Sequence, residues 1–126
     1  MFFVVVLFAA CSQKPAETTP QDSDADMILF FSNTCPHCLK VEDFIKANNI
    51  KDKIEFSQLE VGMLGKAKEN SNLMVEKQKE CKLDEKSLGA IPFFWAKDGT
   101  CLLGDVDIIE YLKSKAGEPI KGEVSQ

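Results

Sequence analysis

The sequence predicts one α/β domain with the element order β-α-β-α-β-β-α, in which a four-stranded mixed sheet lies between layers of helices. Three observations lead to this fold class. Residues 27–31 form a short uninterrupted apolar run, which is typical of a central strand buried on both faces. Apolar residues recur at helical spacing in later segments. Two further apolar runs flank an Asp-Gly pair, which is a strong signal for a β-hairpin.

The first half of the predicted domain is a β-α-β unit. The strand at residues 27–31 is followed by a helix from Pro36 to about residue 47. A proline is harmless in the first turn of a helix, because the N–H that it lacks would have no partner there. Ile54 and Phe56 then alternate with polar residues, which predicts a strand with one solvent-exposed face.

The second half begins with a less regular segment. Residues 62–70 have weak periodicity and are expected to form a loop or a frayed first turn. A helix is predicted from about residue 71 to 83, with Met74, Gln78 and Cys81 along one stripe. This helix is expected to pack on the sheet.

A hairpin and a last helix complete the predicted domain. The hairpin joins strands at residues 92–96 and 101–103. Asp107 and Glu110 stand three apart, as in a capping box, and predict the start of the last helix. Gly117 is expected to end it.

The composition favours one globular domain and argues against nucleic acid as a partner. The 126 residues are 44% hydrophobic and 28% charged, which are ordinary globular values. All 15 basic residues are lysines, and 20 acidic residues bring the formal net charge to -5. No basic face is therefore expected for a phosphate backbone.

The N-terminal residues are typical of an export signal. Residues 1–11 combine an apolar run with a small Ala-Ala pair before Cys11, which resembles a bacterial lipobox with Cys11 as the lipid-modified anchor. The alternative is a buried first strand with an ordinary cysteine. Residues 12–25 are rich in polar residues and proline and are expected to be a disordered tether. The folded domain is then predicted at 26–117 with a flexible tail at 118–126, in an extracytoplasmic, membrane-anchored protein.

The stretch Cys35-Pro36-His37-Cys38 is the candidate for chemistry. A thiol reacts as its thiolate, and a cysteine at the start of a helix faces free N–H groups and the positive end of the helix dipole. Cys35 is therefore predicted to be the exposed nucleophile, and Cys38, one turn later, the shielded resolving thiol. His37 is expected to lower the pKa of the nucleophile, and Pro36 to restrict the loop geometry.

Other interpretations of this stretch remain open. The two thiolates could hold copper(I), or zinc together with His37 and a further ligand, in a metal-binding module or metallochaperone. They could also form a structural disulfide, although so short a loop restrains the unfolded chain little. His37 alone could be an exposed helix residue without a role.

A dithiol between a strand and a helix, followed far downstream by Ile91-Pro92 opening a hairpin, resembles the thioredoxin superfamily. The spacing is similar to that of the short glutaredoxin-type branch, and the resemblance covers about residues 26–116. It implies a thioredoxin-like three-layer fold with helices on both faces of the sheet. It also implies a thiol-disulfide oxidoreductase that needs no cofactor besides the Cys35–Cys38 disulfide.

The resemblance further implies how substrates and partners are engaged. Pro92 matches the cis-proline of the superfamily, and the main chain of Ile91 is then expected to bind an extended substrate segment. The alternative for Pro92 is a trans proline that starts a strand. The implied partners are exported cysteine-containing proteins and a membrane redox partner that recharges the dithiol. A third hypothesis is an interaction domain that keeps the fold without redox activity.

Cys81 and Cys101 are the remaining cysteines of the predicted domain. The helix that carries Cys81 is expected to pack on the sheet that contains Cys101, so a second disulfide is a candidate in an oxidising compartment. The sequence alone favours the other interpretation, which is two small buried thiols.

Overall fold

The computed structural model describes residues 23–117. Their elements, in chain order, are β1 (Met27–Phe31), α1 (Pro36–Ala47), the 3₁₀ helix η1 (Ile50–Asp52), β2 (Ser57–Glu60), α2 (Gly65–Glu80), β3 (Phe93–Ala96), β4 (Cys101–Leu103) and α3 (Asp105–Ala116). The predicted anchor at Cys11, the tether up to residue 22 and the tail at 118–126 lie outside the described residues. Within residues 23–117, no helix combines the length and the apolar character needed to cross a membrane.

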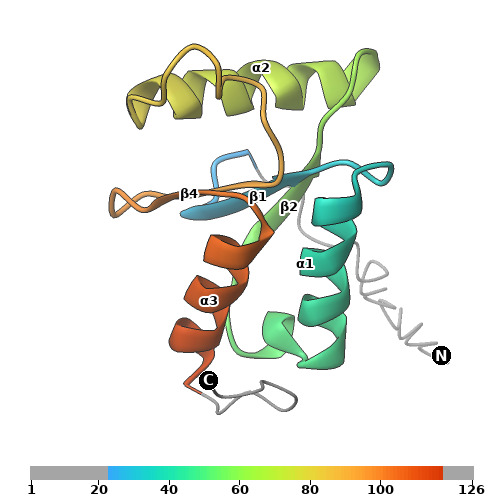
Figure 1. Cartoon of the computed structure of the whole chain (residues 1–126), viewed down its shortest axis with the longest axis vertical. Helices are drawn as coiled ribbons and strands as arrows, with labels where there is room; N and C mark the ends of the chain where they lie inside the picture. The colour runs from blue at the N-terminus through green and yellow to red at the C-terminus, as the bar shows by residue number, and fades with distance from the viewer. Residues whose placement is uncertain (1–22, 118–126) are drawn as a thin grey trace, which may run out of the picture.

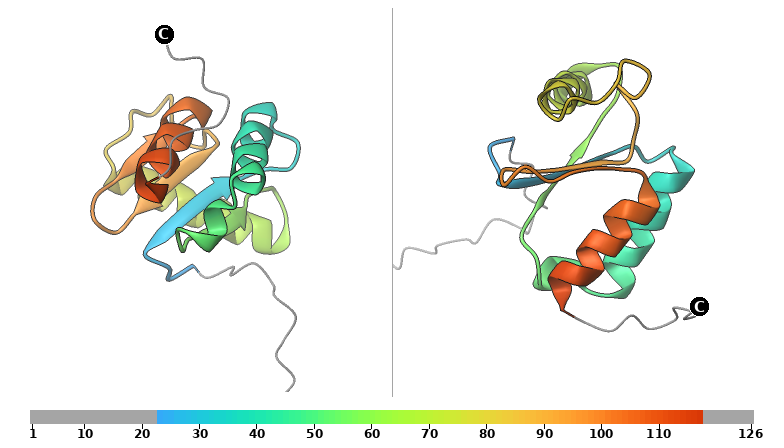
Figure 2. Two further views of the ribbon diagram at one scale, coloured as in Figure 1. Left: turned by 90° about the horizontal axis from the view of Figure 1, so that it is seen from below. Right: turned by 60° about the vertical axis from the view of Figure 1, so that its left-hand side comes forward.

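The four strands form one mixed sheet in the order β2-β1-β3-β4 (Figure 1). β1 pairs parallel with β2 and antiparallel with β3, and β3 and β4 form the predicted antiparallel hairpin. The helices α1 and α3 cover one face of the sheet, while α2 covers the other (Figure 2). This arrangement confirms the predicted fold class and is thioredoxin-like.

β1 is apolar throughout because both of its faces are buried. Successive side chains of a strand point to opposite faces. Leu29 accordingly belongs to the cluster that contains residues of α1 and α3, whereas Ile28 and Phe30 belong to the cluster that contains Met74 of α2. The central strand therefore anchors both helical layers.

The second strand starts later than the alternating pattern predicts. β2 begins at Ser57, whereas Ile54 and Phe56 precede the strand and are themselves buried. The prediction of one solvent-exposed face is wrong, because Gln58 is also buried. Gln58 is accommodated because its Nε2 donates a hydrogen bond to Oε2 of Glu42 on α1, at 2.8 Å.

α2 is longer at its start than predicted. It begins at Gly65 rather than near residue 71, so most of the predicted loop at 62–70 is helical. Its buried residues are Asn70, Met74 and Gln78, which lie four residues apart on one face. Because two of these three residues are polar amides, the apolar periodicity on which the prediction depended is weak.

The C-terminal end of α2 is closed by backbone hydrogen bonds. The N–H of Leu83 donates to the carbonyl of Gln78, and the N–H of Lys82 donates to that of Lys79. Lys82 has a φ of 60°, in the left-handed region, as the residue after the cap does in a Schellman motif. The helix therefore ends at Glu80 rather than at residue 83.

The last helix begins at Asp105, so Asp107 and Glu110 do not form the predicted capping box. Gly104 is the N-cap and has a φ of 96°, a conformation that favours glycine. Asp105 and Asp107 lie in the first turn, where carboxylates interact favourably with the helix dipole. The predicted end at Gly117 is confirmed, and this residue has a φ of 69°.

Candidate functional site

Three segments meet at one end of the sheet and form the candidate site. β1 ends at Phe31 and is followed by a short loop and Cys35. Phe30 of β1 pairs with Phe93 of β3, which places Pro92, the residue before β3, beside the end of β1. The N–H of Gly104, the N-cap of α3, donates to the carbonyl of Pro92 at 2.9 Å. The dithiol, the proline and the start of α3 therefore come from distant parts of the chain to one place.

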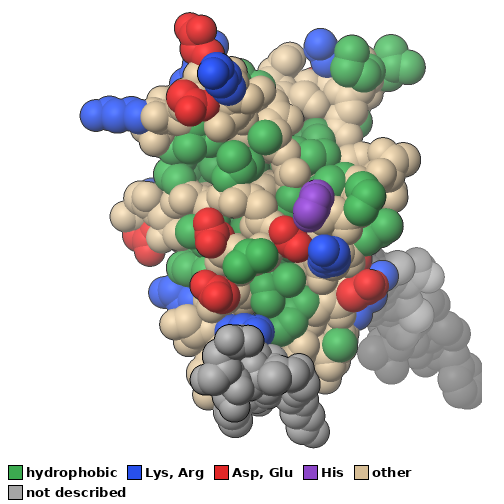
Figure 3. All heavy atoms as spheres, in the orientation of Figure 1, with side chains coloured by type: hydrophobic (Ala, Val, Ile, Leu, Met, Phe, Trp, Pro, Cys, Tyr) green, Lys and Arg blue, Asp and Glu red, His purple; other side chains and the backbone are tan. Residues whose placement is uncertain are grey.

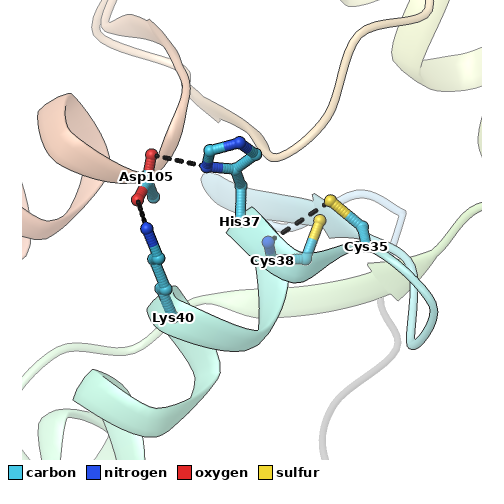
Figure 4. Close-up of polar contacts among 5 residues, drawn as sticks. All are labelled: Cys35, His37, Cys38, Lys40 and Asp105. Atoms are coloured by element: carbon cyan, nitrogen blue, oxygen red, sulfur yellow. Dashed lines mark hydrogen bonds and ion pairs between the residues drawn. The ribbon is translucent and has the colours of Figure 1, made fainter.

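Cys35 occupies the N-cap position of α1. Its backbone is extended, with φ -96° and ψ 116°, and its N–H donates to the carbonyl of Ser32 at 3.2 Å. The N–H of Cys38 donates to Sγ of Cys35 at 3.3 Å (Figure 4). Pro36 follows at the first helical position, where the missing N–H has no helical partner. Cys35 is a half-buried free thiol.

Cys38 lies behind Cys35 and is also a free thiol, with a relative exposure of 3%. Burial, followed by the hydrogen bond with the Cys35 side chain, raises the pKa of Cys38 from 9.0 to about 12. At neutral pH Cys38 is therefore held as a thiol. The structure thus places one half-buried thiol and one buried thiol within a single helical turn.

The side chain of His37 points toward α3. Its Nδ1 lies 3.2 Å from Oδ1 of Asp105, and Nζ of Lys40 lies 3.7 Å from Oδ2 of the same carboxylate. Figure 4 shows the imidazole turned toward Asp105 rather than toward the two sulfurs. The predicted effect of His37 on the nucleophile remains a prediction.

Asp105 is the residue of this site that the sequence did not reveal. Its desolvation raises the pKa, but its own backbone N–H and the positive charges of His37 and Lys40 outweigh this effect, so the pKa lies below its usual value. His37 and Asp105 are separated by 68 residues in sequence. In the sequence, Asp105 is only an acidic residue after Gly104, near the start of a helix. Acidic residues are common there because they interact favourably with the helix dipole, so nothing in the sequence marks Asp105 as part of the site.

The Ile91–Pro92 peptide bond is cis. Pro92 is buried, and Ile91 is partly exposed. The segment before them is tied to α2, because both ends of the Gln78 side-chain amide bond to the backbone of Gly89 and Ala90.

The surface that carries these segments has exposed apolar side chains. Leu39, directly after Cys38, has a relative exposure of 47%, and Val106, directly after Asp105, one of 62%. Figure 3 shows the His37 imidazole at the surface, with apolar side chains on the same face of the molecule.

Cys81 and Cys101 form a disulfide, with their Cα atoms 6.1 Å apart, so the favoured prediction of two separate buried thiols is wrong. Cys81 is the C-cap of α2, and Cys101 is the first residue of β4. The disulfide therefore links the helix on one face of the sheet to the hairpin, and the structure does not bring it into the dithiol site.

Within residues 23–117, no three His, Cys, Asp or Glu side chains are grouped in a way that could hold a metal ion. Comparisons of the chain with protein-family models, with curated proteins and with solved structures find no match.

Proposed function

We propose that this protein is a thiol-disulfide oxidoreductase that acts through Cys35 and Cys38 by way of a mixed disulfide. The observation that carries the proposal is the asymmetry of the two thiols. Cys35 is accessible at the start of α1 and accepts a hydrogen bond from the N–H of Cys38, whereas the Cys38 side chain is 3% exposed and has a pKa raised to about 12. An attacking thiol needs access and a stabilised thiolate, while a resolving thiol needs protection from solvent.

In the first step, the Cys35 thiolate attacks one sulfur of a substrate disulfide. A bond forms between Sγ of Cys35 and that sulfur, the substrate S–S bond breaks, and the other substrate sulfur leaves as a thiolate. The N–H groups at the start of a helix stabilise negative charge, and the N–H of Cys38 donates to Sγ of Cys35 at 3.3 Å. The same contact favours Cys35 as a leaving group in the reverse direction.

In the second step, Cys38 attacks the Cys35 sulfur of the mixed disulfide. Cys38 gives up its proton, the Cys35–Cys38 bond forms, and the second substrate sulfur leaves as a thiolate, so that two electrons have passed to the substrate. Because the pKa of Cys38 is raised to about 12, Cys38 is a thiol at pH 7 and must lose its proton in this step. Cys35 contributes to that raised pKa, and its free thiolate no longer exists in the mixed disulfide, so the pKa of Cys38 should fall when it is needed.

Ile91 and Pro92 are the proposed substrate-binding residues. Pro92 lies beside the end of β1, from which the chain leads to Cys35, and Ile91 is partly exposed. In the superfamily that the motifs resemble, the main chain before this proline pairs with an extended substrate segment. The same pairing would place a substrate disulfide within reach of Cys35.

The proposed place of action is outside the cytoplasm, with a lipid anchor at Cys11 and residues 12–25 as the tether. The Cys81–Cys101 disulfide supports this compartment, because structural disulfides persist in oxidising environments. Exported cysteine-containing proteins would be the substrates, and a membrane redox protein would restore the dithiol after each turnover.

Two single variants test the mechanism. A Cys38→Ser variant should form a mixed disulfide with an oxidised model peptide but fail to release it, and the adduct should map to Cys35 by mass spectrometry. A Cys35→Ser variant should form no adduct and catalyse no peptide reduction by dithiothreitol. A Cys81→Ser/Cys101→Ser variant serves as the control for loss of cysteines elsewhere. Unchanged turnover by Cys35→Ser would eliminate the proposal.

A further inference from the structure

Gln78 is the most deeply buried polar residue of α2. It lies on the buried face of α2, one turn after Met74, and its relative exposure is 0%. An apolar residue at this position would satisfy the helical pattern and pack on the sheet. A buried amide is tolerated only when its donors and acceptors are paired, so the partners of Gln78 indicate what it does.

Both ends of the Gln78 amide bond to one short loop. Its Nε2 donates to the carbonyl of Ala90 at 3.0 Å, and its Oε1 accepts from the N–H of Gly89 at 2.7 Å. Gly89 has a φ of 88°, so the backbone turns here in a conformation that favours glycine. One rigid side chain thus sets the position of two consecutive peptide groups.

These peptide groups lie directly before the Ile91–Pro92 segment. The preceding part of the loop is organised by bonds within itself, because the N–H of Ser87 bonds to the carbonyl and the carboxylate of Asp84, and the N–H of Ala90 bonds to the carbonyl of Ser87. The Gln78 amide instead joins the loop to α2, which is packed on the sheet through Met74. The side chain of Ile91 packs on the core cluster that contains Met74, and the Gln78 bonds hold the main chain directly before it.

We infer that Gln78 is a positioning residue that holds the Ile91 main chain in place to receive an extended polypeptide substrate. This inference rests on the proposed function and goes beyond it, because it assigns substrate affinity to a buried residue of α2 that touches neither sulfur. Losing the Gln78 bonds should weaken the binding of polypeptide substrates. It should leave the reaction of Cys35 with a small disulfide unchanged, because a small disulfide does not use the Ile91 main chain.

Asn70 provides a matched comparison on the same helix. It is also a buried amide, with 5% exposure, and its Nδ2 donates to the carbonyl of Glu60 at 2.9 Å, at the end of β2. An Asn70→Leu variant therefore removes a buried amide-to-backbone bond of α2 without touching the loop before Ile91. It controls for general loosening of the helix.

The experiment compares Gln78→Met with wild type and with Asn70→Leu in the full chain. Methionine keeps the length of the side chain and removes both bonds. The substrates are a disulfide-containing peptide and bis(2-hydroxyethyl) disulfide. We expect Gln78→Met to raise KM for the peptide about tenfold, which corresponds to one net buried hydrogen bond, with kcat and the small-disulfide rate within about twofold of wild type.

The outcomes separate this inference from the proposed function. If wild type reduces neither substrate, the proposed function fails. If wild type is active and Gln78→Met has an unchanged KM for the peptide, or slows both substrates equally, the positioning role is refuted. An equal rise in KM for Asn70→Leu also refutes it. Should Gln78→Met not fold, Gln78→Asn, which keeps a polar group but is too short to reach both peptide groups, is held to the same criteria.

Discussion

Removal of the Cys81–Cys101 disulfide should lower the free energy of unfolding of the domain by an amount set by the length of the loop that the disulfide closes. The two cysteines are 20 residues apart in sequence, and the loop that they close contains the segment before Ile91, β3 and the turn of the hairpin. For a loop of about 20 residues, the chain-entropy relation gives about 3 kcal/mol of stabilisation at 25 °C. Since small domains have free energies of unfolding of about 5–15 kcal/mol, this is a substantial fraction.

The perturbation is a Cys81→Ala/Cys101→Ala double variant, and the assay is urea denaturation followed by far-ultraviolet circular dichroism. Trp95 fluorescence is a poor probe here, because Trp95 pairs with Cys101 in the sheet. Wild type and a Cys38→Ala variant are each measured with and without a reductant. Because Cys38→Ala cannot form the Cys35–Cys38 disulfide, this comparison controls for any effect of reducing the dithiol. A loss below about 1 kcal/mol in the double variant would refute the reasoning that this cross-link restrains the unfolded chain.

Three further predictions concern charges and buried polar groups. The pKa of Cys38 is raised from 9.0 to about 12 in the folded state, so the stability that the Cys38 thiol contributes should be complete below pH 9 and lost between pH 9 and about 12. The urea midpoint of Cys38→Ala should therefore fall less than that of wild type over this pH range. Equal falls in the two midpoints would contradict the prediction. The lowered pKa of Asp105 has the opposite sign, so its contribution should be present above the ordinary value of 3.8 and lost as the pH falls further; Asp105→Asn should flatten the acid limb of the stability curve, and an unchanged limb would count against the contact with His37. Glu42→Ala removes the acceptor of the buried Gln58 amide and should lower the free energy of unfolding by about 1–3 kcal/mol in thermal or urea denaturation. Lys46→Ala breaks only an exposed ion pair to Glu42 and should lower it by less than about 0.5 kcal/mol. Equal losses would contradict the importance of the bond between Gln58 and Glu42.

The elements predicted well are those decided by neighbours in sequence. The apolar run at 27–31, Pro36 at the start of a helix and the Asp-Gly turn each carry a local signal, and β1, α1 and the hairpin follow it. β2 and the start of α2 were misplaced because buried polar residues interrupt the apolar pattern. The acceptor that allows Gln58 to be buried lies on another element, 16 residues away.

In the candidate site, too, the features with a local sequence signal were predicted, and the contacts between distant residues were not. The dithiol is visible as a motif, and the role of Pro92 is implied by the resemblance of the dithiol and the downstream Ile91-Pro92 pair to the thioredoxin superfamily. The contact between His37 and Asp105 joins residues 68 apart, and the tie between Gln78 and the loop before Ile91 depends on how α2 packs. No local sequence pattern predicts either pairing, because each of these side chains is also common at its position in a helix or loop without any such contact.

The most direct test of the proposed asymmetry is the relative alkylation of Cys35 and Cys38 in the wild-type protein with its dithiol reduced. With limiting iodoacetamide at pH 7 and peptide mapping at short times, modification should fall on Cys35. Cys38 should react much more slowly, because its raised pKa lowers its thiolate population and its burial restricts access of the reagent. Equal labelling of the two cysteines, or preferential labelling of Cys38, would contradict the assignment of Cys35 as the attacking thiol and Cys38 as the resolving one.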